Sequence, residues 1–247
     1  MAAVDPVADA PAAVADTGED RALVVADYHA GVEAALRREG IQLDSRADER
    51  RERLLALLDR TAPDRLVFLG DLVHSIGEAV GAESREVEEL LEAVCERVPV
   101  DLVKGNHDGV IEDVVEVPVS PTDGLVIGDV GFVHGHTWPA RAVLEASVVC
   151  VGHEHPAVRL EDAVGGRRLE RVWLRGRLAP APFMDRYDDP PAIDGDLVVF
   201  PAFNDLVGAT WVNLPDQDFL APFLPEALAA GEAYLLDGTR LGAYDRI

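Results

Sequence analysis

The chain has 247 residues, of which 48% are apolar, so it is long enough and apolar enough to bury one large core or two small ones. It carries 46 acidic and 22 basic residues, and a surface with a net charge of −24 repels nucleic acid and anionic membranes at ordinary ionic strength. No run of about 18 apolar residues exists, which excludes a membrane-spanning helix.

The N-terminal segment, residues 1–20, is rich in alanine and contains five acids and no base. It lacks the basic start and apolar middle of a secretory signal, and we expect a flexible acidic tail followed by a single domain over 21–247. Cys95 and Cys150 lie in apolar segments without metal-ligand spacing, which predicts buried free thiols and a cytoplasmic protein. The acid excess fits a halophilic cytosol, where screening lengths fall to about 3 Å.

Buried strands alternate with amphipathic helices in the first half of the chain. The order β-α-β-α-β predicts a parallel sheet with right-handed crossovers. We expect strands at 22–26, 65–69 and 100–103, and helices at 46–58 and 83–97. Each strand ends in a polar motif, and these motifs are Asp27-Tyr28-His29, Gly70-Asp71-Leu72-Val73-His74 and Gly105-Asn106-His107-Asp108.

The second half of the chain is predicted to be mostly β. A hairpin formed by 125–127 and 130–133 ends in His134-Gly135-His136, and a buried strand at 147–151 ends in Gly152-His153-Glu154-His155. Further strands are expected at 157–160, 169–174, 196–200 and 210–214, with a surface loop at 185–195 that is rich in aspartate and proline.

All seven histidines fall at or just past the end of an expected strand or hairpin, which scattered structural histidines would not do. Aspartate, asparagine and imidazole without a thiolate suit Mn²⁺, Fe or Zn²⁺. The ligands are too many for one tetrahedral site. Two ions about 3.5–4 Å apart that share one carboxylate would use them all, and such a pair generates hydroxide and clamps the oxygens of a phosphoryl transfer. The sequence therefore predicts a dinuclear centre.

These motifs, in this order, resemble the calcineurin-like metallophosphoesterases over residues 23–156. The resemblance implies an α/β, four-layer fold with two packed mixed sheets and helices outside. It implies a metal-dependent phosphoester hydrolase, a phosphodiesterase or a nuclease, with two divalent ions. Manganese is expected first, with iron, zinc or nickel as alternatives.

The resemblance also implies residue roles. One ion would be held by Asp27, His29 and His155, the other by Asn106, His134 and His153, and Asp71 would bridge them. His107 would be the general acid at the leaving oxygen, oriented by Asp108.

Two histidines depart from the family pattern. His74 stands where the second motif usually has Asp or Asn, and His136 is two residues past the expected ligand. Both are predicted to support a ligand or to face the substrate. A narrower similarity, in Gly31 and the run Phe200-Pro201-Ala202-Phe203-Asn204, is to small prokaryotic phosphoesterases associated with DNA ligase or helicase genes and described as DNA-damage-response endonucleases.

Three substrate hypotheses stay open. A nucleic-acid substrate is favoured by a locally positive segment, 159–186, in which Arg167 and Arg168 are candidates to bind phosphate, as is Lys104 beside the third motif. Pairing of these cations with neighbouring acids is the competing interpretation. A small nucleotide substrate is favoured by the overall negative charge. A non-catalytic scaffold is disfavoured because every expected ligand position is intact.

Overall fold

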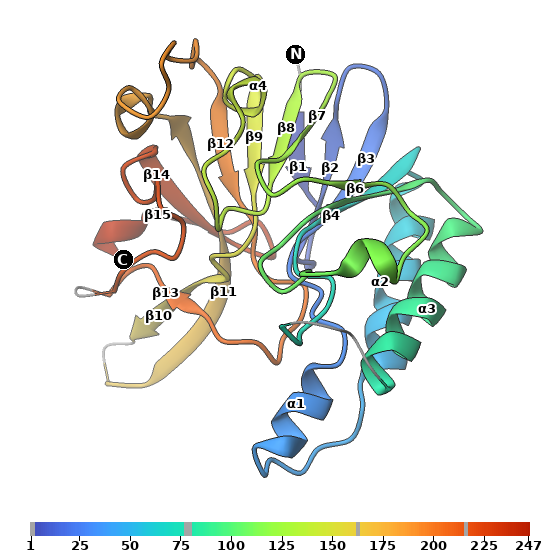
Figure 1. The fold of residues 1–247 in the computed structure, drawn as a ribbon. Helices are drawn as coiled ribbons and strands as arrows, with labels where there is room; N and C mark the ends of the chain where they lie inside the picture. The colour runs from blue at the N-terminus through green and yellow to red at the C-terminus, as the bar shows by residue number, and fades with distance from the viewer. Residues whose placement is uncertain (1–2, 77–80, 162–163, 215–216) are drawn as a thin grey trace.

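The protein is described by a computed structural model over residues 3–76, 81–161, 164–214 and 217–247. Figure 1 shows two β-sheets packed together, with helices α2 and α3 over the outer face of the first sheet. The helices are α1 (Val32–Arg38), α2 (Ala47–Thr61), α3 (Ala82–Cys95) and α4 (Arg141–Leu144). Within the described ranges, no helix is long and apolar enough to cross a membrane.

The first sheet has the strand order β1-β2-β3-β4-β5-β6. Its strands are β1 (Ala3–Pro6), β2 (Ala12–Asp16), β3 (Arg21–Val25), β4 (Arg65–Leu69), β5 (Val100–Val103) and β6 (Val119–Ser120). Strands β3 to β6 are parallel, as the alternation of strands and helices predicts, whereas β1 and β2 add an antiparallel edge.

The expectation of a flexible tail over 1–20 is wrong for residues 3–16, which form β1 and β2. Their alanines are the reason. Ala12 pairs with Val25 of β3, and Ala13 and Ala15 alternate with it to face the space between the sheets. Small side chains at period two fit a crowded sheet position that a count of large apolar residues does not reveal.

The second sheet has the order β13-β10-β11-β12-β9-β8-β7, and β14 pairs with both β11 and β15. Its strands are β7 (Leu125–Ile127), β8 (Val130–Val133), β9 (Val148–Val151), β10 (Pro156–Glu161), β11 (Arg167–Leu178), β12 (Asp196–Val199), β13 (Thr210–Trp211), β14 (Leu228–Leu235) and β15 (Arg240–Ala243). The predicted hairpin of β7 and β8 is confirmed, and β8, β9 and β12 run parallel. Strands β6, β14 and β15 were not predicted.

Three apolar clusters define the layers. The cluster between the sheets contains Leu69, Phe132, Cys150 and Trp173, all fully or nearly fully buried. A second joins the first sheet to α2 and α3, and a third covers the outer face of the second sheet. The fold therefore has the expected layers. On the outside of the second sheet, the cover is α4, a turn around Phe183 and residues 221–228.

The two thiols differ in exposure. Cys150 is buried between the sheets, as predicted, but Cys95 is exposed at the last turn of α3, and both are free. Cys95 is the last residue of α3, and Val94 is the last residue on the buried face of that helix. Its side chain therefore falls on the solvent side.

Candidate metal centre

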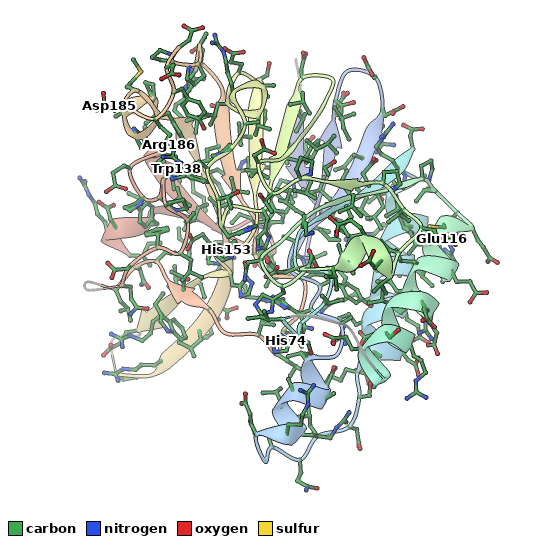
Figure 2. All side chains as sticks on the ribbon, viewed as in Figure 1. His74, Glu116, Trp138, His153, Asp185 and Arg186 are labelled. Atoms are coloured by element: carbon green, nitrogen blue, oxygen red, sulfur yellow. The ribbon has the colours of Figure 1, made fainter. Side chains whose placement is uncertain are left out.

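The polar motifs of both sheets meet where five parallel strands end. Strands β3, β4 and β5 of the first sheet deliver Asp27, Asp71 and Asn106, because parallel strands end at the same edge. Strands β8 and β9 of the second sheet deliver His134 and His153 to the same place. Figure 2 labels His153 near the middle of the molecule and His74 below it, toward α1.

Five candidate ligands have a left-handed backbone, which is uncommon outside glycine. Their φ angles are 58° at Asp27, 49° at His29, 50° at Asp71, 67° at His153 and 44° at His155. Such conformations cost on the order of 1–3 kcal/mol each and persist only where surrounding contacts enforce them. Nothing in the sequence pattern reveals this feature.

Backbone hydrogen bonds hold these loops together. The amide of Asp27 donates to the carbonyl of Gly70, and the amide of His29 donates to the carbonyl of Asp71. The amide of His153 lies 3.2 Å from both carboxylate oxygens of Asp27. The first motif is thus tied to the second and to the last, although they are far apart in sequence.

Two glycines allow the loops to approach closely. A Cβ atom on Gly70 would lie 2.2 Å from Nδ1 of His134, and one on Gly105 would lie 2.1 Å from Oδ1 of Asp71. Any other residue at either position would displace a candidate ligand.

Two groups of side chains have the spacing of a metal site. Asp27, His29 and His155 form one, and Asp71, His134 and His153 form the other, with all ligand atoms of a group within 4.8 Å of one another. Asp71 also contacts the first group, because its Oδ2 lies 3.4 Å from Nε2 of His134 and 3.7 Å from Nε2 of His29. Asn106 joins the second group through Oδ1, 3.1 Å from Nε2 of His134.

The donor set fits divalent metal. The Nε2 atoms of His29 and His155 are buried without a hydrogen bond, although Nε2 of His155 lies 3.2 Å from Oδ1 of Asp27. Burial lowers the pKa of His29 to about 3 and that of His153 to about 4, so both imidazoles are neutral with a free lone pair. Burial raises the pKa of Asp27, but His155 and His134 outweigh it and hold that pKa below its usual value. The neutral imidazoles of His29 and His153 and the ionised carboxylate of Asp27 are the ligand states that such metals require.

His134 has the opposite shift. Burial lowers its pKa, but the neighbouring Asp71 carboxylate prevails and raises the pKa to about 9. Its Nδ1 lies 2.9 Å from the carbonyl oxygen of Leu69, which fixes the ring with Nε2 toward Asp71 and Asn106. This is the orientation that a metal-binding histidine needs.

His74 and His107 form a third group with His29. Nδ1 of His74 lies 3.3 Å from Nδ1 of His29, and Nδ1 of His107 lies 2.5 Å from the backbone carbonyl oxygen of His74. Nε2 of His107 is 3.9 Å from Oδ2 of Asp71. His107 therefore presents Nε2 to the metal centre, while the loop of His74 holds its other nitrogen.

That Asp108 orients the ring of His107 stays a prediction, and in the structure the Asp108 carboxylate has backbone partners. The carboxylate is fully buried and accepts the amides of Val73 and Gly105, at 3.2 and 2.8 Å. Burial and the nearby Asp71 raise the pKa of Asp108 to about 6. Asp108 thus joins the second and third motifs through their backbones, and the carbonyl group of His74 contacts the imidazole instead.

His136 lies beside the second ligand group. Its ring centroid is 5.2 Å from that of His134 and 6.0 Å from that of His153. Burial and then His134 lower its pKa to about 4, and its Nδ1 is buried without a partner. It lines a surface cavity together with Trp138 and Arg186, so a role facing the substrate stays a prediction.

The three predicted phosphate-binding cations are paired with acids. Nζ of Lys104 lies 2.7 Å from Glu112, Arg168 is 2.8 Å from Glu170, and Arg167 is 3.4 Å from Glu161. Arg167 opposes Glu161 at the far end of the β10–β11 hairpin, roughly 20 Å along an extended strand from His155. The interpretation as ion pairs therefore holds for these residues.

Arg171 belongs to the same positive segment, 159–186, and does lie close to the candidate metal centre. It opposes Ala157 in the hairpin and lines a cavity of about 250 Å³ with His155. It donates a hydrogen bond to the carbonyl oxygen of Ala202. The register of β10 with β11 explains why the two arginines differ. The antiparallel pairing places Arg171 opposite the start of β10, next to His155, and places Arg167 at the opposite end of the hairpin.

Asn204 is a further residue whose role the sequence did not predict. Its side-chain amide donates to the carbonyl oxygens of Tyr28 and His29, at 2.9 and 3.2 Å. Glu83 similarly accepts the amides of His74 and Ser75. These buried side chains hold the backbone of the first and second motifs in place.

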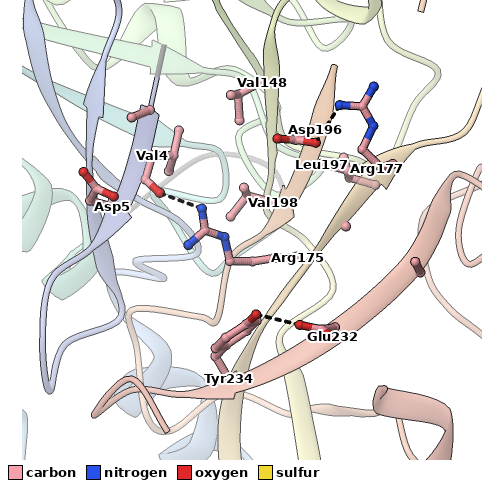
Figure 3. Close-up of a pocket in the computed structure, with 13 residues that line it drawn as sticks. Val4, Asp5, Val148, Arg175, Arg177, Asp196, Leu197, Val198, Glu232 and Tyr234 are labelled. Atoms are coloured by element: carbon pink, nitrogen blue, oxygen red, sulfur yellow. Dashed lines mark hydrogen bonds and ion pairs between the residues drawn. The ribbon is translucent and has the colours of Figure 1, made fainter. Parts of the chain in front are cut away.

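A cavity of about 540 Å³ opens beside the metal centre and is lined by His29, His107 and His155. Another, of about 440 Å³, lies between β1 and strands β11, β12 and β14 (Figure 3). There Arg177 pairs with Asp196 and Tyr234 donates to Glu232, and none of the histidines lines it. The first cavity is the one that chemistry at the metal centre would use.

Comparisons with known proteins agree with this geometry. A sequence model of the calcineurin-like phosphoesterase family matches residues 20–144. The crystal structure of Pseudomonas putida nuclease MPE is similar, with a TM-score of 0.57 and 21% identity over 95% of this chain and 98% of that one. Yfce, a phosphoesterase from E. coli, matches over 57% of this chain and 74% of its own, with 22% identity and a TM-score of 0.37. Among curated proteins, no sequence matches the chain significantly.

Proposed function

The chain belongs to the calcineurin-like phosphoesterase family, and we propose that it is a phosphodiesterase that uses two divalent metal ions and acts on nucleic acid. The observation that carries the proposal is the position of Asp71, whose carboxylate lies within 4 Å of a histidine in each ligand group. A shared carboxylate is what a pair of closely spaced ions requires.

Each group of ligands has a defined part in this proposal. Asp27, His29 and His155 hold one ion, Asn106, His134 and His153 hold the other, and Asp71 serves both. When bound, the ions supply positive charge to the phosphoryl oxygens and lower the pKa of a water molecule. Imidazole, carboxylate and amide donors without thiolate suit Mn²⁺, which we propose as the working metal.

His107 is the proposed general acid. The contact of its Nδ1 with the carbonyl oxygen of His74 leaves Nε2 free to donate a proton to the leaving oxygen. This role makes a specific prediction about leaving groups, because an alkoxide needs a proton far more than a nitrophenolate does.

A nucleic-acid substrate is supported by a fold similar to that of a protein named as a nuclease and by Arg171 beside His155. The second candidate is a phosphodiesterase for a small nucleotide. It is favoured by the net charge of −24 and by the pairing of Lys104, Arg167 and Arg168 with acids, because a long polyanion would be repelled.

The test uses metal-stripped protein with Mn²⁺ added back, a nitrophenyl phosphodiester and single-stranded DNA. We expect metal to restore both activities. His107→Ala should lower DNA cleavage by about 10²–10⁴-fold and nitrophenyl hydrolysis much less. Val110→Ala, at an exposed position on the same loop, is the matched control. Absence of turnover with metal bound would refute the proposal, and turnover of small diesters without DNA cleavage would favour the second candidate.

A further inference from the structure

The cavity beside His107 has an apolar wall on two sides. Helix α1 contributes Val32, Ala35 and Leu36, and the loop after Asn204 contributes Leu206 and Val207. At about 540 Å³, the space is within the usual range of pockets for small organic groups. A planar, largely apolar group such as a nucleobase fits this chemistry.

The charges at this cavity are negative. Among the described residues that line it, none is lysine or arginine, and Glu39 and Asp218 are exposed carboxylates. The third acid, Glu154, is buried and accepts the amides of Leu220 and Ala221, so it is turned into the fold. A phosphate group placed in this cavity would meet two exposed acids and, among the described lining residues, no lysine or arginine.

The neighbouring cavity differs. It lies across the loop 207–209, which lines both spaces, and it is lined by Arg171 and Trp211 together with the acids Glu170 and Asp205. His155 also lines both, so the two cavities meet beside this candidate ligand. The two sides of a bound diester would therefore meet different surroundings, since one cavity is lined by no lysine or arginine and the other has Arg171 among its acids.

From this asymmetry, and resting on the proposed function, we propose that the cavity at His107 receives the leaving group, and that this group is a nucleoside without a second phosphate. Water attacks phosphorus, the bond from phosphorus to the leaving oxygen breaks, and that oxygen takes a proton from His107. The products are a phosphomonoester and a free nucleoside hydroxyl. The enzyme would accordingly release a terminal nucleoside or split a dinucleoside monophosphate, and would disfavour internal bonds.

The experiment compares kcat/KM for three thymidine compounds in the presence of Mn²⁺: TpT, and TpT with an added phosphate at its 5′ end or at its 3′ end. We expect one of the two added phosphates, the one on the leaving nucleoside, to lower kcat/KM by tenfold or more. Glu39→Lys should recover roughly three- to tenfold of that loss at low ionic strength, because it reverses one of the two exposed negative charges that line the cavity.

The matched control is Glu116→Lys, which changes the net charge equally at an exposed site that Figure 2 places away from His74. Equal kcat/KM for all three compounds, or equal recovery by Glu39→Lys and Glu116→Lys, would overturn the inference while TpT cleavage left the proposed function intact. Failure to hydrolyse TpT and a nitrophenyl diester alike would overturn both.

Discussion

A buried ion triad supports the loops of the metal centre, and its central cation is Arg50. Arg50 is 4% exposed and binds Glu33 at 3.0 Å and Glu86 at 2.5 Å, with both carboxylates also buried. Glu86 in turn accepts the amide of Gly31, two residues past the first motif. The triad therefore joins α1, α2 and α3 behind the candidate ligands.

Replacing Arg50 with methionine should destabilise the protein by about 3–5 kcal/mol, because two buried carboxylates lose their cation. For a chain of this size that corresponds to a fall of roughly 6–20 °C in Tm. Thermal and urea unfolding of the metal-free protein measure it. Adding Glu33→Gln and Glu86→Gln should recover most of the loss, since the triple variant buries no charge.

The loss of unfolding free energy in Arg50→Met, called the deficit below, should also depend on pH. Without the cation, burial would raise the pKa of both glutamates above the unfolded value of about 4.3. A group whose folded pKa is raised loses stability as pH rises from the unfolded value to the folded one. The deficit should therefore be small below about pH 4 and grow above it.

Arg51→Met is the control, because Arg51 pairs with the exposed acids Asp48 and Glu89 and should cost no more than about 1 kcal/mol. If Arg50→Met unfolds at the same urea concentration as Arg51→Met, the reasoning from buried charge is refuted.

Three other predictions concern the metal centre and the solvent. Asn204→Ala removes the side-chain donor to the carbonyls of Tyr28 and His29 and should weaken Mn²⁺ binding by about 10–100-fold in calorimetric titration; unchanged affinity would contradict its positioning role. Mn²⁺ at 100 times its Kd should raise the free energy of unfolding of metal-stripped protein by about 2.7 kcal/mol, and an unchanged Tm would argue against a preformed site. Molar KCl should raise the urea midpoint if the acid excess is a halophilic adaptation, whereas a midpoint independent of salt would remove that interpretation.

The positions of the candidate ligands were predictable because short local sequence patterns mark the ends of the strands. An apolar run followed by Gly-Asp or Gly-Asn-His needs no knowledge of distant residues, and the strands at 65–69 and 100–103 have those bounds in the structure. Parallel pairing then brings their ends together, as expected. Local signal and topology agree here, so the sequence suffices.

What the sequence did not predict depends on partners far along the chain. Arg167 and Arg171 are alike in sequence, and only the register of β10 with β11 separates the one at the hairpin end from the one near His155. Asp108 looks like a partner for the adjacent imidazole, yet its oxygens accept the amides of Val73 and Gly105. Each contact depends on the three-dimensional arrangement of loops, which residue types alone do not fix.

The left-handed backbones of the candidate ligands connect the fold to the chemistry. Asp27, His29 and Asp71 belong to the first sheet and His153 and His155 to the second, so neither sheet can complete the centre alone. The strain at these residues persists because the packing between the sheets, around Trp173 and Phe200, holds the two sets of loops against each other. Loosening that core would let the loops relax to ordinary backbone angles and would turn the imidazoles away. Residues without contact to a substrate therefore determine the geometry on which metal binding depends.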